Sequence, residues 1–205
     1  MYEHMIKILC YGDSNTYGYI PGTAQRYDDN TRWTAVLARL LGDNYSIIEA
    51  GCNNRTCFSD NETGELQTGY KYINRYLNQK PDIIILSLGI NDLQCVYNPS
   101  LIEFETGLKQ FIEQVKMMYD LAKILVISPP CLDENVLRGD FSVQFNKDSV
   151  KKSKLLPGIY EKISSQAGCI YLNPDISPSS VDGLHFSKDA HLLIAKKIKE
   201  VILKL

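Results

Sequence analysis

A serine, a histidine and an aspartate stand in short motifs that favour ester chemistry. Ser14 ends the motif Gly12-Asp13-Ser14, and Asp182 precedes His185 by three positions near the other end of the chain. A serine hydroxyl is a weak nucleophile at neutral pH and needs an adjacent base. Imidazole suits that role, and a carboxylate can hold its tautomer and stabilise the imidazolium. We therefore predict a catalytic set of Ser14, His185 and Asp182.

Two further motifs supply hydrogen-bond donors for the oxyanion of a tetrahedral intermediate. They are Gly51-Cys52-Asn53-Asn54 and Gly89-Ile90-Asn91-Asp92, and each follows a predicted strand. We predict an oxyanion hole made by the backbone N–H groups of Ser14 and Asn54 and the side-chain amide of Asn91. Losing one such donor typically costs about 10²–10³ in turnover.

Each of these residues also has an ordinary structural interpretation. Ser14 alone would serve as a helix N-cap, His185 alone could be structural, and Asn91 alone would be a turn residue. Only their combination favours catalysis. The carboxylates of Asp13 and Asp92 are expected to bond backbone N–H groups. The residues expected to support the site are Gly12, Asp13, Gly51, Gly89 and Asp92.

Other charged and titratable residues are expected to be structural. For Arg55 we predict an ion pair across loops, with substrate binding as the alternative. His191 is predicted to be a surface or packing residue of the last helix, and His4 to lie in a frayed terminus. A mixed cluster is expected to be a solvated face: Lys147, Asp148, Lys151 and Lys152.

Alternating strands and helices would position these motifs. Apolar, β-branched runs predict strands over residues 6–11, 45–50, 83–88, 124–128 and 169–172. Helical spacing predicts helices over residues 31–41, 68–78, 100–120 and 151–166, and a last helix capped by Ser187. This alternation predicts right-handed crossovers and a parallel α/β sheet, whose carboxyl ends form the ligand crevice.

Three loops are expected to shape the pockets for the acyl group and the alcohol. They span residues 17–30, 93–99 and 131–149, and the last is long enough to suggest a function. Their tyrosines, together with Phe141 and Phe145, are candidates to line these pockets, with surface packing as an equal alternative.

Composition bounds the class of protein. The chain has 205 residues, 44% of them hydrophobic and 22% charged, which predicts a single globular domain over residues 1–205. A net charge of −2 gives no general attraction to nucleic acid or to an anionic membrane. No apolar run is long enough to span a bilayer, and the first residues do not read as a secretion signal.

Cysteine usage predicts a reducing compartment. Six scattered cysteines without a secretion signal favour free thiols and a cytoplasmic location. Cys52 and Cys57 could pair or bind a metal, but no second ligand pair with zinc spacing accompanies them. We therefore predict no metal and no cofactor.

Four motifs taken in order resemble those of the SGNH hydrolases, also called GDSL esterases or lipases. The first block stands as Gly12-Asp13-Ser14-Asn15, with asparagine where the family has leucine. The second pairs Gly51 with Asn54, where the family often has glycine. The third and last blocks, Gly89-Ile90-Asn91-Asp92 and Asp182-Gly183-Leu184-His185, are intact. The resemblance implies a flavodoxin-like three-layer α/β/α sandwich with strand order 2-1-3-4-5.

Several phrases resemble the arylesterase/acyltransferase branch of that family. They are Tyr11-Gly12-Asp13-Ser14, Arg32-Trp33-Thr34, Ile48-Glu49-Ala50-Gly51 with Arg55-Thr56, Ser128-Pro129-Pro130 and Asp182-Gly183-Leu184-His185-Phe186. That branch implies small ester substrates, acyl transfer to alcohols and homo-oligomers. Two alternatives stay open: a carbohydrate acetylesterase that uses the same residues, and a non-catalytic flavodoxin-like protein that binds an anion or a flavin at Gly12-Asp13-Ser14.

Overall fold

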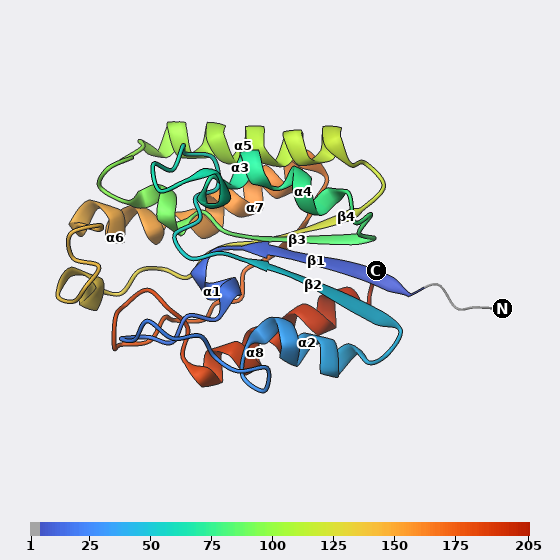
Figure 1. The fold of residues 1–205 in the computed structure, drawn as a ribbon. Coiled ribbons are helices and arrows are strands. Elements are labelled where there is room, and N and C mark those ends of the chain that lie inside the picture. Colours follow the sequence, from blue (N-terminus) through green and yellow to red (C-terminus); the bar gives the residue numbers. More distant parts are fainter. Residues whose placement is uncertain (1–4) are drawn as a thin grey trace.

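A computed structural model describes residues 5–205 and places five parallel strands in one sheet (Figure 1). The strands are β1 (Ile6–Gly12), β2 (Tyr45–Gly51), β3 (Ile83–Ser87), β4 (Lys123–Ile127) and β5 (Ile170–Leu172). Their order, β2-β1-β3-β4-β5, confirms the predicted topology. The prediction made for His4 lies outside the described residues.

Helices cover both faces of the sheet, as Figure 1 shows. One face carries α3 (Gly69–Tyr72), α4 (Asn74–Leu77), α5 (Leu101–Met118) and α7 (Leu156–Ala167), and the other carries α2 (Trp33–Leu41) and α8 (Lys188–Ile202). Alternate residues of β3 enter different cores: Ile84 belongs to the first and Ile85 to the second. This explains the continuous apolar run, because a parallel strand covered on both faces has no polar side.

Cap residues set the ends of the two longest helices. Ser100 and Glu103 form a capping box that starts α5, and the Ser187 hydroxyl accepts the Ala190 N–H at the start of α8, as predicted. Leu205 lies beyond the end of α8 at Ile202 and is 38% exposed. None of the helices in residues 5–205 has the length and apolar character that a bilayer crossing requires.

Two predicted helices differ from the observed ones. The helix predicted over 68–78 is split into α3 and α4 by a turn at Ile73. A helix absent from the prediction, α6 (Lys147–Ser153), begins inside the expected loop because Asn146 caps it. Pro157 then lies in the first turn of α7, where its missing N–H costs nothing, so the chain makes two helices rather than one.

Candidate active site

The first motif makes a sharp turn from β1 into α1 (Ser14–Tyr17). Only glycine fits at position 12, since a Cβ there would lie 2.0 Å from Thr16 Oγ1 and 2.4 Å from the Ser87 carbonyl oxygen. Asp13 caps the short helix by accepting the Asn15 N–H at 2.9 Å. Ser14 therefore lies at the carboxyl end of the second strand in the sheet order.

The structure brings Ser14, His185 and Asp182 into one hydrogen-bonded chain. His185 Nε2 lies 2.9 Å from Ser14 Oγ, although 171 positions separate the two residues. His185 Nδ1 lies 2.8 Å from Asp182 Oδ2. If Nδ1 carries the proton, Nε2 is free to accept the hydroxyl proton of Ser14, which is the geometry that a serine nucleophile requires.

The carboxylate of Asp182 is held in its ionised form. Burial is the largest single effect and raises the pKa of this carboxyl, but the hydrogen bond to His185, the charge of that ring and two backbone donors together outweigh it. Those donors are the N–H groups of Leu184 and His185, each 3.0 Å from Asp182 Oδ1. The net result is a pKa below the usual value for aspartate, so the carboxylate can orient His185 and stabilise its imidazolium.

Asn15 links the serine turn to the histidine loop. Its Oδ1 accepts the Phe186 N–H at 2.8 Å, and its Nδ2 donates to the Leu184 carbonyl at 3.3 Å. These two residues flank His185. Asn15 directly follows the nucleophile and stands where the family has leucine. Its side chain therefore ties the serine turn to the backbone on both sides of the imidazole.

The residues that carry the three predicted oxyanion donors line one pocket together with His185. They are Ser14, Asn54 and Asn91. Within residues 5–205, no protein acceptor pairs with the backbone N–H of Ser14 or Asn54. Asn54 has φ +62°, a left-handed conformation that asparagine tolerates better than most residues. Asn91 Nδ2 donates to the Arg55 carbonyl at 3.0 Å, and its second N–H has no acceptor in the described chain.

Asp13 and Asp92 bond to backbone groups, which suits supporting residues. Asp92 accepts the N–H groups of Cys57, Phe58 and Ser59 at 2.6, 3.1 and 2.9 Å. Burial raises the pKa of Asp13 to about 7, and burial also raises the pKa of Asp92 despite its three donors. Asp92 therefore anchors the loop that carries Asn54 to the one that carries Asn91.

The expectations for Arg55 are wrong. Its side chain is fully buried, so it cannot meet a substrate, and within residues 5–205 it forms no ion pair. The guanidinium instead donates to the carbonyl groups of Gly12, Ala50 and Leu66 and lies over the Tyr11 ring, 4.3 Å from its centroid. Carbonyl dipoles and a ring face compensate the buried charge in place of a carboxylate.

A pocket of about 180 Å³ opens beside the nucleophile. Tyr19 stacks on the His185 ring with centroids 4.2 Å apart, and Phe141 meets the same ring edge-on at 5.1 Å. Phe145, which was also a candidate, is buried in the core and does not line this pocket. The lining residues are Ser14, Tyr19, Asn53, Asn54, Asn91, Phe141, Gln144, Leu184 and His185.

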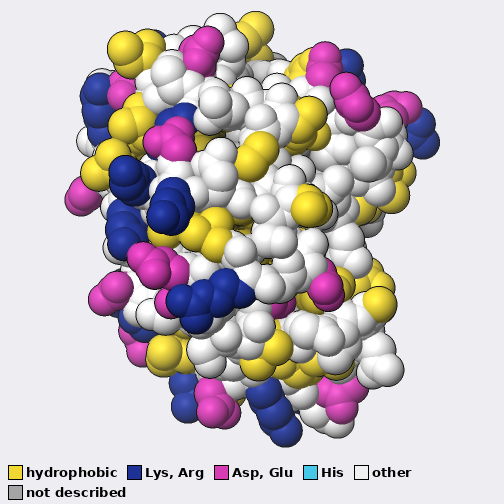
Figure 2. All heavy atoms as spheres, turned by 90° about the vertical axis from the view of Figure 1, so that its left-hand side faces the viewer, with side chains coloured by type: hydrophobic (Ala, Val, Ile, Leu, Met, Phe, Trp, Pro, Cys, Tyr) yellow, Lys and Arg dark blue, Asp and Glu magenta, His cyan; other side chains and the backbone are white. Residues whose placement is uncertain are grey.

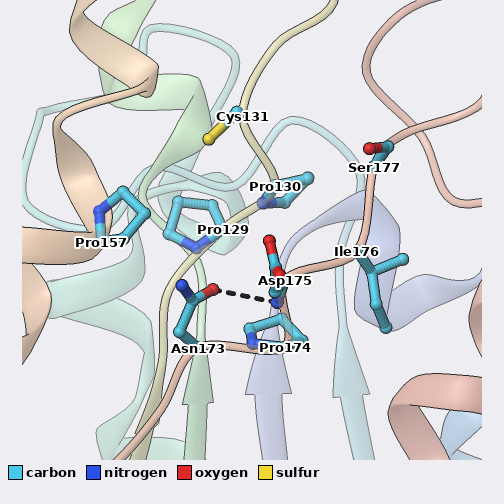
Figure 3. A pocket seen from close by; sticks show the side chains of 9 residues that line it. All are labelled: Pro129, Pro130, Cys131, Pro157, Asn173, Pro174, Asp175, Ile176 and Ser177. Carbon is cyan, nitrogen blue, oxygen red and sulfur yellow. Dashed lines mark hydrogen bonds between the residues drawn. The ribbon is translucent and has the colours of Figure 1, made fainter.

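The surface around the carboxyl ends of the strands is mixed in character. Figure 2 views this side of the molecule, where scattered hydrophobic side chains lie among uncharged side chains and backbone, and many charged side chains gather on the left of the view. A second, smaller cavity of about 90 Å³ lies beyond β4 and β5, between Pro129, Pro157 and Pro174 (Figure 3). Asn173 there accepts the Asp175 N–H at 3.0 Å, and the residues drawn include no histidine.

The described residues give no cluster with the makings of a metal centre. Across residues 5–205, no three histidine, cysteine, aspartate or glutamate side chains gather as metal ligands would. Cys52 and Cys57 are both free thiols.

One residue of the site has no counterpart in the sequence predictions. Gln94 ends the 3₁₀ helix η2 (Ile90–Leu93), and its side-chain amide bonds to both Asn54 and Asn91. A 3₁₀ helix has about three residues per turn, so positions 91 and 94 share one side. The spacing would have indicated this contact only if a 3₁₀ helix had been predicted there.

Comparison with known proteins gives a consistent result. Residues 10–193 match the family described as GDSL-like lipase/acylhydrolase. The inhibitor-bound aryl esterase of M. smegmatis superposes with a TM-score of 0.90 at 27% identity, covering 98% of this chain and 99% of that one. Est24, a carbohydrate acetylesterase from Sinorhizobium meliloti, gives 0.87 at 28% identity, with 97% and 99% covered. A search of curated proteins found no match.

Proposed function

Because the chain belongs to the GDSL-like lipase/acylhydrolase family and is a carboxylic ester hydrolase, we propose that it cleaves small esters through an acyl-enzyme on Ser14. His185 is the proposed base and Asp182 the carboxylate that orients it. The observation that carries this proposal is the 2.9 Å contact between His185 Nε2 and Ser14 Oγ, backed by the 2.8 Å contact to Asp182.

In the proposed mechanism, Ser14 Oγ attacks the ester carbonyl carbon while His185 Nε2 takes the hydroxyl proton. The tetrahedral oxyanion is bound by the N–H groups of Ser14 and Asn54 and by the second N–H of Asn91. As this intermediate collapses, His185 gives its proton to the leaving alcohol. Water, deprotonated by His185, then attacks the acyl-enzyme, and Ser14 regains its proton as the acid leaves.

A fluorophosphonate probe tests this proposal directly. Intact-mass measurement should show one adduct on the wild-type protein and none on Ser14→Ala. The alternative is a flavodoxin-like protein that only binds an anion at the same turn. Absence of an adduct, together with anion binding that the Ser14→Ala change leaves intact, would favour that alternative.

A specific observation also favours a carbohydrate acetylesterase. The pocket carries the amide side chains of Asn53, Asn54 and Gln144, and those of Asn53 and Gln144 have no partner within residues 5–205. Free amides can bind the hydroxyl groups of a sugar alcohol. Initial rates on acetylated sugars and on p-nitrophenyl esters of increasing chain length would separate the two: a preference for the acetylated sugars supports this second candidate.

The finer expectations are also proposals: transfer of the acyl group to alcohols, a cytoplasmic location and self-association. Product analysis in the presence of a primary alcohol should reveal a new ester. Light scattering of the purified protein should give a mass above that of one chain. Fractionation of cells should recover the protein with cytoplasmic markers.

A further inference from the structure

The side-chain amide of Gln94 lies behind the two residues proposed to bind the oxyanion. Its Nε2 is 2.8 Å from Asn54 Oδ1 and 3.1 Å from Asn91 Oδ1. A primary amide carries two N–H groups, so one nitrogen can serve both acceptors. Gln94 is 6% exposed and does not line the pocket, so it meets neither bulk water nor a bound substrate.

The hydrogen bond from Gln94 to Asn91 decides which way the side-chain amide of Asn91 faces. The oxygen and nitrogen of an asparagine side chain have nearly the same shape, so a half-turn exchanges a donor for an acceptor. Gln94 holds Oδ1 as an acceptor, and the Arg55 carbonyl holds one N–H of Nδ2 at 3.0 Å. Together they leave the second N–H of Asn91 as the group that can meet an oxyanion.

The hydrogen bond from Gln94 to Asn54 holds the Asn54 side chain in place. The backbone N–H of Asn54 is another of the proposed oxyanion donors. Asn54 has φ +62°, and two contacts keep it there: Gln94 bonds its side chain, and Asn61 Nδ2 donates to its carbonyl at 2.7 Å. The family's usual glycine has no side chain for Gln94 to bind. Asn54 and Gln94 therefore work as a pair in this chain.

Resting on the proposed function, we propose that Gln94 is the positioning residue of the oxyanion hole. One buried amide orients the Asn91 side chain and the Asn54 backbone together, before the substrate arrives. Preorganised donors of this kind lower the barrier because they need no rearrangement as charge develops. The effect of Gln94 should thus appear in the transition state and hardly at all in ground-state binding.

The first test is Gln94→Met, which keeps the length of the side chain and removes both donors. We expect kcat to fall about 10- to 100-fold, less than the loss of a whole oxyanion donor, with little change in KM. The affinity for an alkyl trifluoromethyl ketone should fall in parallel, because this inhibitor forms a charged tetrahedral adduct on the serine. Unchanged kcat and unchanged inhibitor affinity would overturn the proposal.

Gln114→Met is the matched control. Gln114 lies on α5, and its Nε2 donates to the Tyr70 carbonyl at 2.7 Å and to Met118 Sδ at 3.6 Å, so the same change removes side-chain amide hydrogen bonds away from the site. We expect a lowered melting temperature with kcat and inhibitor affinity like the wild type. If Gln114→Met reduced kcat as much as Gln94→Met, the effect would be one of general stability and the proposal would fail.

A double-mutant cycle with Asn54→Gly tests the pairing. Without the Asn54 side chain, Gln94 acts only through Asn91, so Gln94→Met should cost several-fold less in kcat than in the wild-type background. Equal costs in both backgrounds would remove Asn54 from the proposal.

Gln94→Glu covers the case in which the methionine variant does not fold. A carboxylate of the same shape only accepts, so it would repel both Oδ1 atoms and turn the Asn91 amide around. We expect a loss of about 10²–10³ in kcat, comparable to losing a donor. A wild-type protein without Ser14-dependent hydrolysis would overturn both the proposed function and this inference. Active wild type with equally active Gln94 variants would overturn the inference alone.

Discussion

Two histidines on neighbouring parts of the chain are both buried, and the structure gives them different surroundings. His185 has a partner on each ring nitrogen, Asp182 on one side and Ser14 on the other. His191 accepts the Trp33 N–H through Nδ1 at 3.3 Å, and its Nε2 has no partner within residues 5–205. Burial therefore does not distinguish a candidate base; the carboxylate and the hydroxyl beside it do.

The electrostatic surroundings of His191 also distinguish it from His185. Burial lowers the pKa of His191 to about 4, and the nearby Arg32 guanidinium adds to that effect. The ring thus stays neutral at physiological pH and keeps an acceptor at the start of α2, where the first N–H groups of a helix lack partners. We interpret His191 as a structural acceptor and His185 as the group that exchanges protons.

The largest expected effect separates the two histidines by activity. His185→Gln should cut ester turnover by about 10⁶, as losses of a base from such sites do. His191→Asn, which retains an acceptor for the Trp33 N–H, should leave turnover within a few-fold. The measurement is kcat on a p-nitrophenyl ester. Similar losses in both variants would remove the distinction between them.

The next effect tests the partner that sets His185 apart. Asp182→Asn should reduce kcat by about 10⁴, because an amide nitrogen facing Nδ1 favours the wrong imidazole tautomer. Asp189→Asn, an exposed position in the first turn of α8, is the control and should retain full kcat. Comparable kcat for the two variants would show that the carboxylate has no role in orienting His185.

A third prediction concerns pH and follows from His191. Its folded pKa of about 4 lies below the usual value of 6.5, so acid favours the unfolded chain, which takes up the proton first. The contribution of His191 is fully present above pH 6.5 and is lost as the pH falls toward 4, about 3 kcal/mol in all. Urea unfolding at several pH values should show the free energy of unfolding of the wild type falling from pH 6.5 toward pH 4. The slope of this fall with pH should be smaller in His191→Asn. Equal slopes would contradict a neutral buried ring.

The smallest effect tests the link between the serine turn and the histidine loop. Asn15→Leu introduces the residue usual in the family and removes the bonds to the Leu184 carbonyl and the Phe186 N–H. We expect kcat to fall about tenfold, since His185 would be less well placed for the attack. The pH-dependence of stability due to His191 should not change. A kcat equal to that of the wild type would show that packing alone places His185.

The predictions from sequence were most accurate for features that depend on residue type and on spacing to near neighbours in the chain. The apolar runs predicted the strands, their alternation with helices predicted a parallel sheet, and the Ser187 cap predicted the start of α8. Errors came where neighbours distant in the chain decide the outcome. Arg55 met carbonyl groups instead of a carboxylate, and Phe145 entered the core while Phe141 faced the pocket.

The amino-acid sequence by itself determined which side chains follow which strands, because hydrophobic periodicity and glycine turns are local properties. Only the tertiary structure decided that His185 reaches Ser14 across 171 positions, that His191 does not, and that Gln94 joins Asn54 to Asn91. Such contacts depend on how loops pack over the carboxyl edge of the sheet, within a few tenths of an ångström. No pattern of residue types along one chain specifies distances of that size.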